Sequence, residues 1–247
     1  FEKYRDTKIG LFEKLARKKD GIGVYNLDDE NVEWFLKPKV ATKIGFSLKN
    51  NFQSIFKIVN VQLKNDGSEF DVSDVHFEIP LIGEFNVYNT VGAIAMARAL
   101  GVSLEKCAEV LKKPTRISGR FEVIHTRSFT NVQDDNDDFV VIVDYAHEPK
   151  SLEEAYRAAK LFLRRAQNER GKVRGTDAEG KLICLLGSQG GGRDKWKRTE
   201  MGKIAAKYCD EIILTNEDPY DEIPLNIMND IEQGISQTSN PIRQSAD

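Results

Sequence analysis

The chain has few cysteines and histidines, and it has no long hydrophobic run. Its three cysteines are odd in number, far apart and without a histidine cluster, at positions Cys107, Cys184 and Cys209. We therefore expect neither a disulfide framework nor a zinc site, and a reducing compartment fits better. No segment approaches the roughly 20 apolar residues that a membrane span needs, and no signal peptide opens the sequence. The composition thus argues against a membrane protein and against a disulfide-stabilised secreted domain.

An excess of charge of one sign is missing as well. The 247 residues include 36 Lys and Arg against 39 Asp and Glu, for a net charge of −3, and no basic stripe is visible. Nothing therefore favours a nucleic-acid partner. The hydrophobic fraction of 40% and the charged fraction of 30% are typical of a globular protein with a substantial core. The length corresponds to one large domain or two ordinary ones.

The first part of the chain mixes helices and strands. Helical spacing predicts an amphipathic helix over 1–19, whose shared face holds Tyr4, Lys8, Leu11, Phe12 and Leu15. We expect Asp28 and Asp29 to cap a short helix that runs to residue 36.

Several strands and two more helices should follow. The strands are expected between Thr42 and Ile79, with a turn at 65–67. A helix is predicted over 86–100, closed by a glycine. Ser103 is expected to cap the next helix, which proline ends at position 114.

Beyond a boundary near residues 113–118, apolar strands alternate with helices. The strands are expected over 139–143, 182–186 and 211–215. Residues 168–180 are charged and glycine-rich and should form a surface loop. Apolar strands separated by helices predict a parallel sheet covered on both faces. The predicted fold class is therefore α/β.

Polar clusters follow all three strands, at the place where ligands bind in an open parallel sheet. They cover residues 144–149, 187–198 and 216–220. In the first cluster, Asp144 suits a ribose hydroxyl or a turn. His147 suits phosphate contact, the role of a base near neutral pH, or a structural role. Three clusters at one sheet edge predict a site more strongly than any one of them alone.

The second cluster contains a glycine run, residues 190–192, followed by Arg193. Backbone N–H groups in such a run can hold an anion before a helix, and arginine can grip a carboxylate or phosphate bidentately. A flexible strand-to-helix turn explains the glycines equally well. The run is not a Walker A loop, because the pattern G-x-x-x-x-G-K-[ST] occurs nowhere in the chain.

Five strings, in order along the chain, resemble the Mur ligases in the branch of the UDP-N-acetylmuramyl-tripeptide synthetases. The most specific is Asp-Tyr-Ala-His-x-Pro at 144–149, followed by Ser-Leu-Glu at 151–153. Sister branches read differently there. The other strings are Tyr-x-x-x-Lys-x-x-Leu-Phe at 4–12, Gly-Glu-Phe-Asn-Val-Tyr-Asn at 83–89, Gly-Arg-Phe-Glu at 119–122 and Arg-Asp-x-x-Lys-Arg at 193–198. The resemblance spans essentially the whole chain.

This resemblance implies two domains and a truncated chain. Residues 1–115 would be the C-terminal part of a central ATP-binding domain. Residues 116–247 would be a truncated, Rossmann-like C-terminal domain with a mainly parallel sheet that binds the amino acid. The UDP-binding domain and the Walker A loop would precede Phe1, and the last strands would follow Asp247. Without the phosphate loop, we expect this fragment alone to be inactive.

The resemblance also implies roles around ATP and Mg²⁺. Lys8 corresponds to a lysine that these enzymes carbamylate, which turns a cation into a carboxylate-like ligand for Mg²⁺. Asn86 and Asn89 correspond to adenine contacts, since an amide both donates and accepts hydrogen bonds. The phosphate contact, the ribose contact and a catalytic position beside the nucleotide fall on Arg120, Asp144 and His147, respectively.

The amino-acid substrate is implied to bind at the second and third clusters. Arg193 corresponds to the arginine that grips the carboxylate of the incoming amino acid. Enzymes that add meso-diaminopimelate usually carry Asp-Asn-Pro-Arg in the third cluster, where this chain has Glu-Asp-Pro-Tyr at 217–220. Two acidic side chains there suit a cationic group, so the resemblance leaves open which amino acid is added. The implied substrate-binding residues are Arg193, Asp194, Lys197, Asn216, Glu217, Asp218 and Tyr220.

The implied reaction adds an amino acid, which we expect to be a diamino acid, to UDP-N-acetylmuramoyl-L-alanyl-D-glutamate in peptidoglycan biosynthesis. ATP phosphorylates the D-glutamyl carboxylate, and the amine attacks the acyl phosphate. Mg²⁺ and basic residues offset negative charge as the phosphoryl group moves. We expect a monomer in the bacterial cytoplasm whose partners are this UDP-MurNAc-dipeptide and a free amino acid, with no nucleic acid or membrane.

Two other readings remain open. The chain could be a related amide ligase of the cyanophycin-synthetase or folylpolyglutamate-synthase kind, although the string at 144–147 disfavours them. It could also be a non-catalytic nucleotide-binding relative. The full set of matching residues argues against a relative that has lost catalysis. An intact phosphate loop upstream would support an enzyme, and its absence would support a non-catalytic relative.

Overall fold

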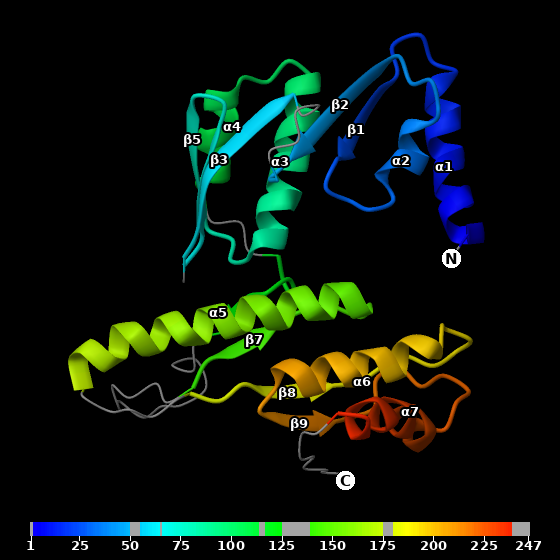
Figure 1. The fold of residues 1–247 in the computed structure, drawn as a ribbon, viewed down its shortest axis with the longest axis vertical. Coiled ribbons are helices and arrows are strands. Elements are labelled where there is room, and N and C mark those ends of the chain that lie inside the picture. The colour runs from blue at the N-terminus through cyan, green and yellow to red at the C-terminus, as the bar shows by residue number, and fades with distance from the viewer. Residues whose placement is uncertain are drawn as a thin grey trace. The chain divides into compact units, whose positions relative to one another are not determined.

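The computed structural model describes residues 2–49, 55–64, 66–113, 117–124, 139–174 and 180–238, without the side chains of 165–174. The chain forms two compact units, residues 1–115 (unit 1) and 116–247 (unit 2), whose helices and strands are labelled in Figure 1. Each unit has a hydrophobic core of its own. Within the described residues, every helix is too short or too polar to cross a membrane. The predicted α/β class is confirmed.

Unit 1 is built on a five-stranded sheet in the order β1-β2-β3-β4-β5. The first three strands are parallel, and the last two pairings are antiparallel. The helix α3 packs against β1 and β2, and α4 packs against β5. The elements are α1 (Glu2–Ala16), β1 (Ile22–Asn26), α2 (Val32–Leu36), β2 (Thr42–Ser47), β3 (Phe56–Leu63), β4 (Ser68–Val72), β5 (Val75–Ile79), α3 (Glu84–Ala99) and α4 (Leu104–Leu111).

The core of unit 1 follows from two apolar periodicities. Along β4 and β5 alternate side chains point inward, and the rings of Phe70 and Phe77 stack with centroids 5.5 Å apart at 0% exposure. Along α3 the buried residues recur at helical spacing, as at Val87, Val91 and Ile94. This packing fixes the rotation of α3 and therefore the face on which its polar residues lie.

Two predictions for unit 1 are wrong in detail. Asp28 and Asp29 do not cap α2, because that helix begins later and its N-cap, Asn31, makes no side-chain capping bond. The predicted apolar face of α1 is only partly used. Phe12 packs against the rings of Tyr25 and Phe35, whereas Tyr4 and Leu11 are exposed. The cap at Ser103 is confirmed, since its side chain accepts a hydrogen bond from the backbone of Lys106.

Unit 2 places three helices over short strands. The strands β8 and β9 pair in parallel, as predicted, while β6 and β7 pair antiparallel. Helix α6 packs against both α5 and α7, and their apolar side chains meet those of β8 and β9 in one core. The elements are β6 (Glu122–Ile124), β7 (Val141–Val143), α5 (Pro149–Arg174), β8 (Ile183–Leu186), α6 (Trp196–Tyr208), β9 (Glu211–Leu214) and α7 (Pro224–Ser236).

Three predictions for unit 2 are corrected. The loop expected over 168–180 is helical as far as Arg174, because its Glu, Arg and Lys residues are strong helix formers; residues 175–179 lie outside the described part. The strands are not covered on both faces, since Ile183 and Leu185 are 57% and 69% exposed. Finally, Cys184 and Cys209 form a disulfide, because β8 and the end of α6 lie side by side.

Candidate functional site

The loop that follows β7 is anchored by Asp144. One carboxylate oxygen accepts a hydrogen bond from the backbone N–H of Phe121 at 2.7 Å, and the other accepts one from Ala146 at 2.8 Å. The N–H of Tyr145 donates to the carbonyl of Gly119 at 2.8 Å. These bonds tie the loop to the segment before β6, so the predicted residues Arg120 and Asp144 lie on neighbouring segments.

Arg120 and His147 flank the exposed ring of Tyr145. The guanidinium carbon of Arg120 lies 5.4 Å from the ring centroid, and the His147 ring meets it edge-on at 5.5 Å. His147 Nδ1 lies 3.1 Å from the carbonyl oxygen of Tyr145. Because a carbonyl only accepts, Nδ1 carries the proton in this bond. Nε2 of a neutral His147 is then left as an acceptor.

Lys197 connects this loop to the first turn of α6. Its ammonium group donates to Glu148 Oε1 at 3.2 Å, and the lysine side chain is only 4% exposed. Glu148 Oε1 also lies 3.9 Å from His147 Nε2. Glu148 is therefore the link between the first and second polar clusters.

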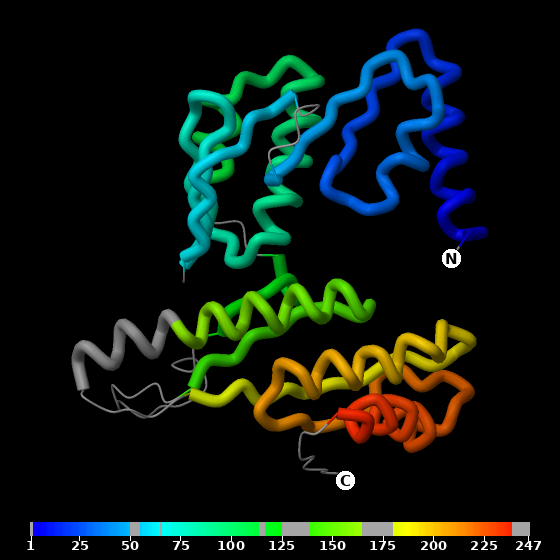
Figure 2. The backbone as a smooth tube through the Cα atoms, in the orientation of Figure 1, coloured from blue at the N-terminus to red at the C-terminus, as the bar shows by residue number. Residues whose placement is uncertain are grey.

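The glycine run and the loop after β9 are in direct contact. The N–H of Gly190 donates to the carbonyl of Asp218 at 3.1 Å. A Cβ at Gly190 would lie 2.1 Å from the carbonyl oxygen of Pro219, and one at Gly191 would lie 2.9 Å from the Tyr220 ring. Only glycine permits this approach. Figure 2 traces both loops to the same end of unit 2.

The predicted substrate residues differ in how they are held. Arg193 and Asp194 are exposed in the loop before α6, as are Asn216, Asp218 and Tyr220 in the loop after β9. Asp218 and Tyr220 have positive φ angles of 36° and 53°, a conformation that L residues seldom adopt. Unit 2 thus presents an exposed arginine and two acidic side chains on loops that contact each other.

The predicted residues of unit 1 lie on two of its helices. Lys8 is exposed on α1, with Nζ 4.6 Å from the Tyr4 ring centroid. The Asn86 side chain donates to the carbonyl of Ile82 at 2.8 Å, and Asn89 is exposed one turn further along α3. The alternative role of Asn86 as a helix cap is not observed, because the N-cap of α3 is Gly83. The adenine contacts remain predictions.

Asp28 is a residue of this region that sequence reasoning misassigned. Its carboxylate accepts hydrogen bonds from the Ser47 hydroxyl at 2.5 Å, the Leu48 N–H at 2.7 Å and the Tyr88 hydroxyl at 2.9 Å. Burial acts to raise the pKa of Asp28, but these hydrogen bonds outweigh it and hold the pKa below its ordinary value. Asp28 thereby ties α3, between Asn86 and Asn89, to the end of β2.

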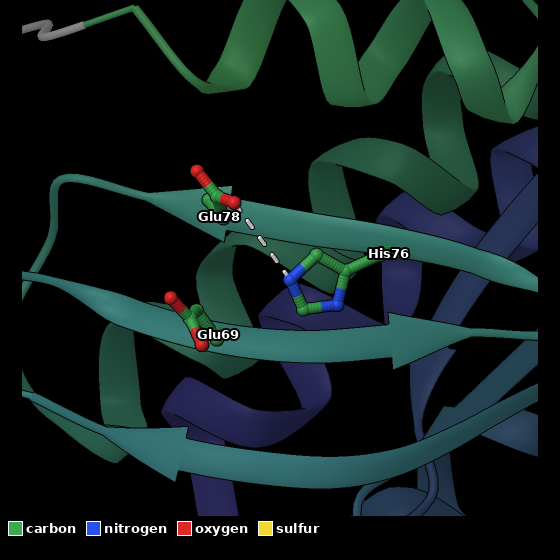
Figure 3. Close-up of side chains that lie close together, drawn as sticks. All are labelled: Glu69, His76 and Glu78. Atoms are coloured by element: carbon green, nitrogen blue, oxygen red, sulfur yellow. Dashed lines mark ion pairs between the residues drawn. The ribbon is translucent and has the colours of Figure 1, made fainter.

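One further group of ionisable side chains lies on the outer face of β4 and β5. Glu69, His76 and Glu78 have ligand atoms within 4.8 Å of one another (Figure 3). Each already has a partner: Lys64 pairs with Glu69, Lys112 lies 2.8 Å from Glu78, and Asp71 lies 2.7 Å from His76 Nδ1. These pairs offset the repulsion between two glutamates that face each other across the strands, so we assign no metal to the group.

Two family profiles match nearly the whole chain. The profile described as the Mur ligase middle domain matches residues 1–97. The profile described as the Mur ligase, glutamate ligase domain matches residues 119–246. The division between unit 1 and unit 2 falls in the segment between the two matches, residues 98–118.

Two curated relatives each match about 95% of this chain. A UDP-N-acetylmuramoyl-L-alanyl-D-glutamate–2,6-diaminopimelate ligase of Clostridium acetobutylicum is 33% identical over 95% of this chain and 43% of its own length. The ligase of the same name from Prochlorococcus marinus is 35% identical over 95% of the chain and 44% of its own length. The chain thus spans less than half of these relatives.

Solved structures of similar proteins share the fold. A structure of a UDP-N-acetylmuramoyl-L-alanyl-D-glutamate–2,6-diaminopimelate ligase aligns with a TM-score of 0.52 and 26% identity, over 100% of this chain and 46% of its own. MurF from Acinetobacter baumannii aligns with a TM-score of 0.65 and 18% identity, over 94% of this chain and 44% of its own.

Proposed function

The chain belongs to the Mur ligase family, and we propose that the whole protein is an ATP-dependent ligase that joins an amino acid to UDP-N-acetylmuramoyl-L-alanyl-D-glutamate in peptidoglycan synthesis. In this proposal residues 1–115 belong to the central ATP-binding domain and residues 116–247 to the amino-acid-binding domain. The names of the relatives support the substrate. The observation that carries the proposal is the contact between the glycine run and the loop after β9, with Arg193 exposed beside it.

Two sets of residues are proposed to contact the nucleotide. Asn86 and Asn89 are proposed to contact the adenine, and Arg120 and Asp144 the phosphates and ribose. Both oxygens of Asp144 already accept backbone N–H bonds, but each retains a lone pair for a hydroxyl. Arg120 is exposed and free to turn toward an anion, which its planar fork suits.

Lys8 is proposed to act as a carbamate. Its amine is exposed, so CO₂ can reach it, and the product is an anionic oxygen ligand of the kind that Mg²⁺ prefers. When bound, Mg²⁺ would neutralise phosphate charge during transfer. His147 is proposed to accept a proton beside the nucleotide, because its Nδ1 proton is held by the Tyr145 carbonyl.

The proposed reaction has two steps. The D-glutamyl carboxylate takes the γ-phosphoryl group of ATP and ADP leaves. The amine of the amino acid then displaces phosphate from the acyl phosphate and loses a proton as the amide forms. Arg193 would hold the carboxylate of the incoming amino acid, which leaves its amine directed at the acyl carbon. Asp194, Lys197 and Asn216 would complete this pocket.

The amino acid is proposed to be a diamino acid. Glu217 and Asp218 carry negative charge in the loop that contacts the glycine run, which favours a side-chain ammonium group. Tyr220 stands where the diaminopimelate pattern places arginine, so lysine and ornithine join diaminopimelate as candidates. We further propose a monomer that acts in the bacterial cytoplasm.

The test is ADP release by the full-length protein with ATP, Mg²⁺, the UDP-linked dipeptide and each of the three amino acids. We expect ADP release that depends on both the dipeptide and one diamino acid. Arg193→Ala should raise the KM for that amino acid more than about tenfold, through loss of a charge-assisted pair. Arg157→Ala removes an exposed arginine of α5 and should leave KM unchanged.

One result would overturn the proposal, namely ADP release that ignores every amino acid offered to the full-length protein. Amine-dependent turnover by residues 1–247 alone would instead refute the expectation that this fragment is inactive, because the Walker A pattern occurs nowhere in this chain.

A further inference from the structure

Arg198 lies at the centre of unit 2 and is 0% exposed. A guanidinium is almost never fully buried unless it is paired, and Arg198 has three partners. Its Nη1 and Nη2 each donate at 3.0 Å to one oxygen of Glu222. Nη1 also donates to Asp230 at 3.0 Å, and Nη2 to the carbonyl of Gln189 at 3.0 Å.

These partners belong to three different segments. Gln189 precedes the glycine run, Glu222 closes the loop after β9, and Asp230 lies on α7. Arg198 itself is in the first turn of α6. The buried guanidinium therefore bonds to both proposed substrate loops at once. Its bond to Asp230 connects it to α7 as well.

Glu222 is the part of this arrangement that belongs to the substrate loop. Its bidentate bond to Arg198 fixes both distance and orientation. Lys195 adds a second cation at 2.9 Å from the solvent side. The hydrogen bond from Arg198 has the larger effect and that from Lys195 the smaller, and together they lower the pKa of Glu222 to about 2. The carboxylate therefore remains charged at every physiological pH.

The two loops near Arg198 and Glu222 pack closely against each other. The contacts of Gly190 with Pro219 and of Gly191 with Tyr220 have no room for a side chain. The two loops share one direct hydrogen bond, from Gly190 to Asp218, and the Arg198 side chain adds bonds to both of them.

We propose that Arg198 and Glu222 are positioning residues that set the spacing between Arg193 and the loop 216–220, and so select the length of the amino acid that fits. The inference rests on the proposed function of these loops. Neither residue touches the substrate in this proposal. Their effect passes through the backbone of the two loops.

The test compares Glu222→Gln with Asp230→Asn in the full-length protein. Each variant removes the negative charge of one carboxylate paired with Arg198 and keeps the shape of that side chain, but only Glu222 lies on a substrate loop. We expect Glu222→Gln to raise the KM for the amino acid about tenfold, as for loss of a hydrogen bond to a charged group, with the KM for ATP within about twofold. Asp230→Asn should leave both KM values within about twofold.

A second readout does not depend on catalysis. Amide hydrogen exchange of the peptides covering 187–193 and 215–222 should be faster in Glu222→Gln than in Asp230→Asn. Glu222→Asp, which keeps the charge but is shorter, should be intermediate in both measurements and carries the test if Glu222→Gln does not fold.

The outcomes separate the two proposals. Equal KM values and equal exchange in the Glu222 and Asp230 variants would show that Arg198 is only structural, and would overturn the positioning role. A wild-type protein without amino-acid-dependent ADP release would refute the proposed function instead, while the exchange data would still decide whether Arg198 holds the two loops together.

Discussion

Both units have an apolar core, but they differ in the largest side chain that each one buries completely. In unit 1 the largest fully buried side chains are Phe70 and Phe77, whereas in unit 2 the largest is Arg198. Unit 1 therefore owes its order to apolar packing that is tolerant of direction. Unit 2 owes the order of its loops to a charge that needs particular partners in particular places. The stability of unit 1 is therefore expected to depend on buried apolar area, whereas the geometry of the two loops in unit 2 is expected to depend on the bonds of one guanidinium.

In unit 1, the largest loss of stability is expected from Phe70→Ala. Removing a fully buried aromatic ring that stacks on Phe77 should lower the free energy of unfolding by about 3–5 kcal/mol. Denaturant unfolding measures this loss. Met96→Ala, on the exposed side of α3, is the control and should cost less than about 1 kcal/mol. Equal losses would mean that the apolar centre is not what holds unit 1.

The matching change in unit 2 is Arg198→Ala. It leaves Glu222 and Asp230 without their buried partner and should lower the free energy of unfolding by about 3 kcal/mol. Arg193→Ala removes an exposed arginine five residues away and should change it by less than about 0.5 kcal/mol. Thermal unfolding of both variants checks this. Identical values would contradict a central role for the guanidinium.

The pH dependence sharpens the same contrast. The pKa of Glu222 is lowered from 4.5 to about 2, so its contribution to stability is full above about pH 5 and is lost as the pH falls toward 2. The stability difference between wild type and Glu222→Gln should therefore close over that range. Urea unfolding at a series of pH values measures it, and a difference that persists at pH 2 would refute the assignment.

Unit 1 has one polar centre of its own, and Asp28→Ala tests it. This change removes the acceptor of three hydrogen bonds, including that of Tyr88 on α3, and should cost about 2–3 kcal/mol. Asp29→Ala is the neighbouring control, because Asp29 accepts a single side-chain bond, from the N–H of Asn31, and should cost about 1 kcal/mol or less. Comparable losses would show that Asp28 is an ordinary turn residue.

Whether the sequence predicted a structural feature depends on how far apart along the chain its interacting residues lie. Helix α3 and the cap at Ser103 depend on residues within a few positions of each other, and both were predicted. The role of Asp28 was not, because its partners at 47, 48 and 88 are far along the chain. The disulfide between Cys184 and Cys209 was missed for the same reason.

The candidate site shows the same division. Its residues were named from strings that resemble a family, and the contact between the second and third clusters follows from parallel strands that end at one edge. The group that bonds the two loops, Arg198, was present in one of those strings and was not assigned a role. Burial at 0% is a property of the folded chain, and no local pattern distinguishes Arg198 from the exposed Arg193.

The account is tested most directly by the mass of the product formed by the full-length protein from ATP, the UDP-linked dipeptide and a mixture of diaminopimelate, lysine and ornithine. It predicts a single main product whose mass is the dipeptide substrate plus one diamino acid minus water, with one ADP released for each. A product that lacks the amino acid, or ADP released without any new amide, would contradict it.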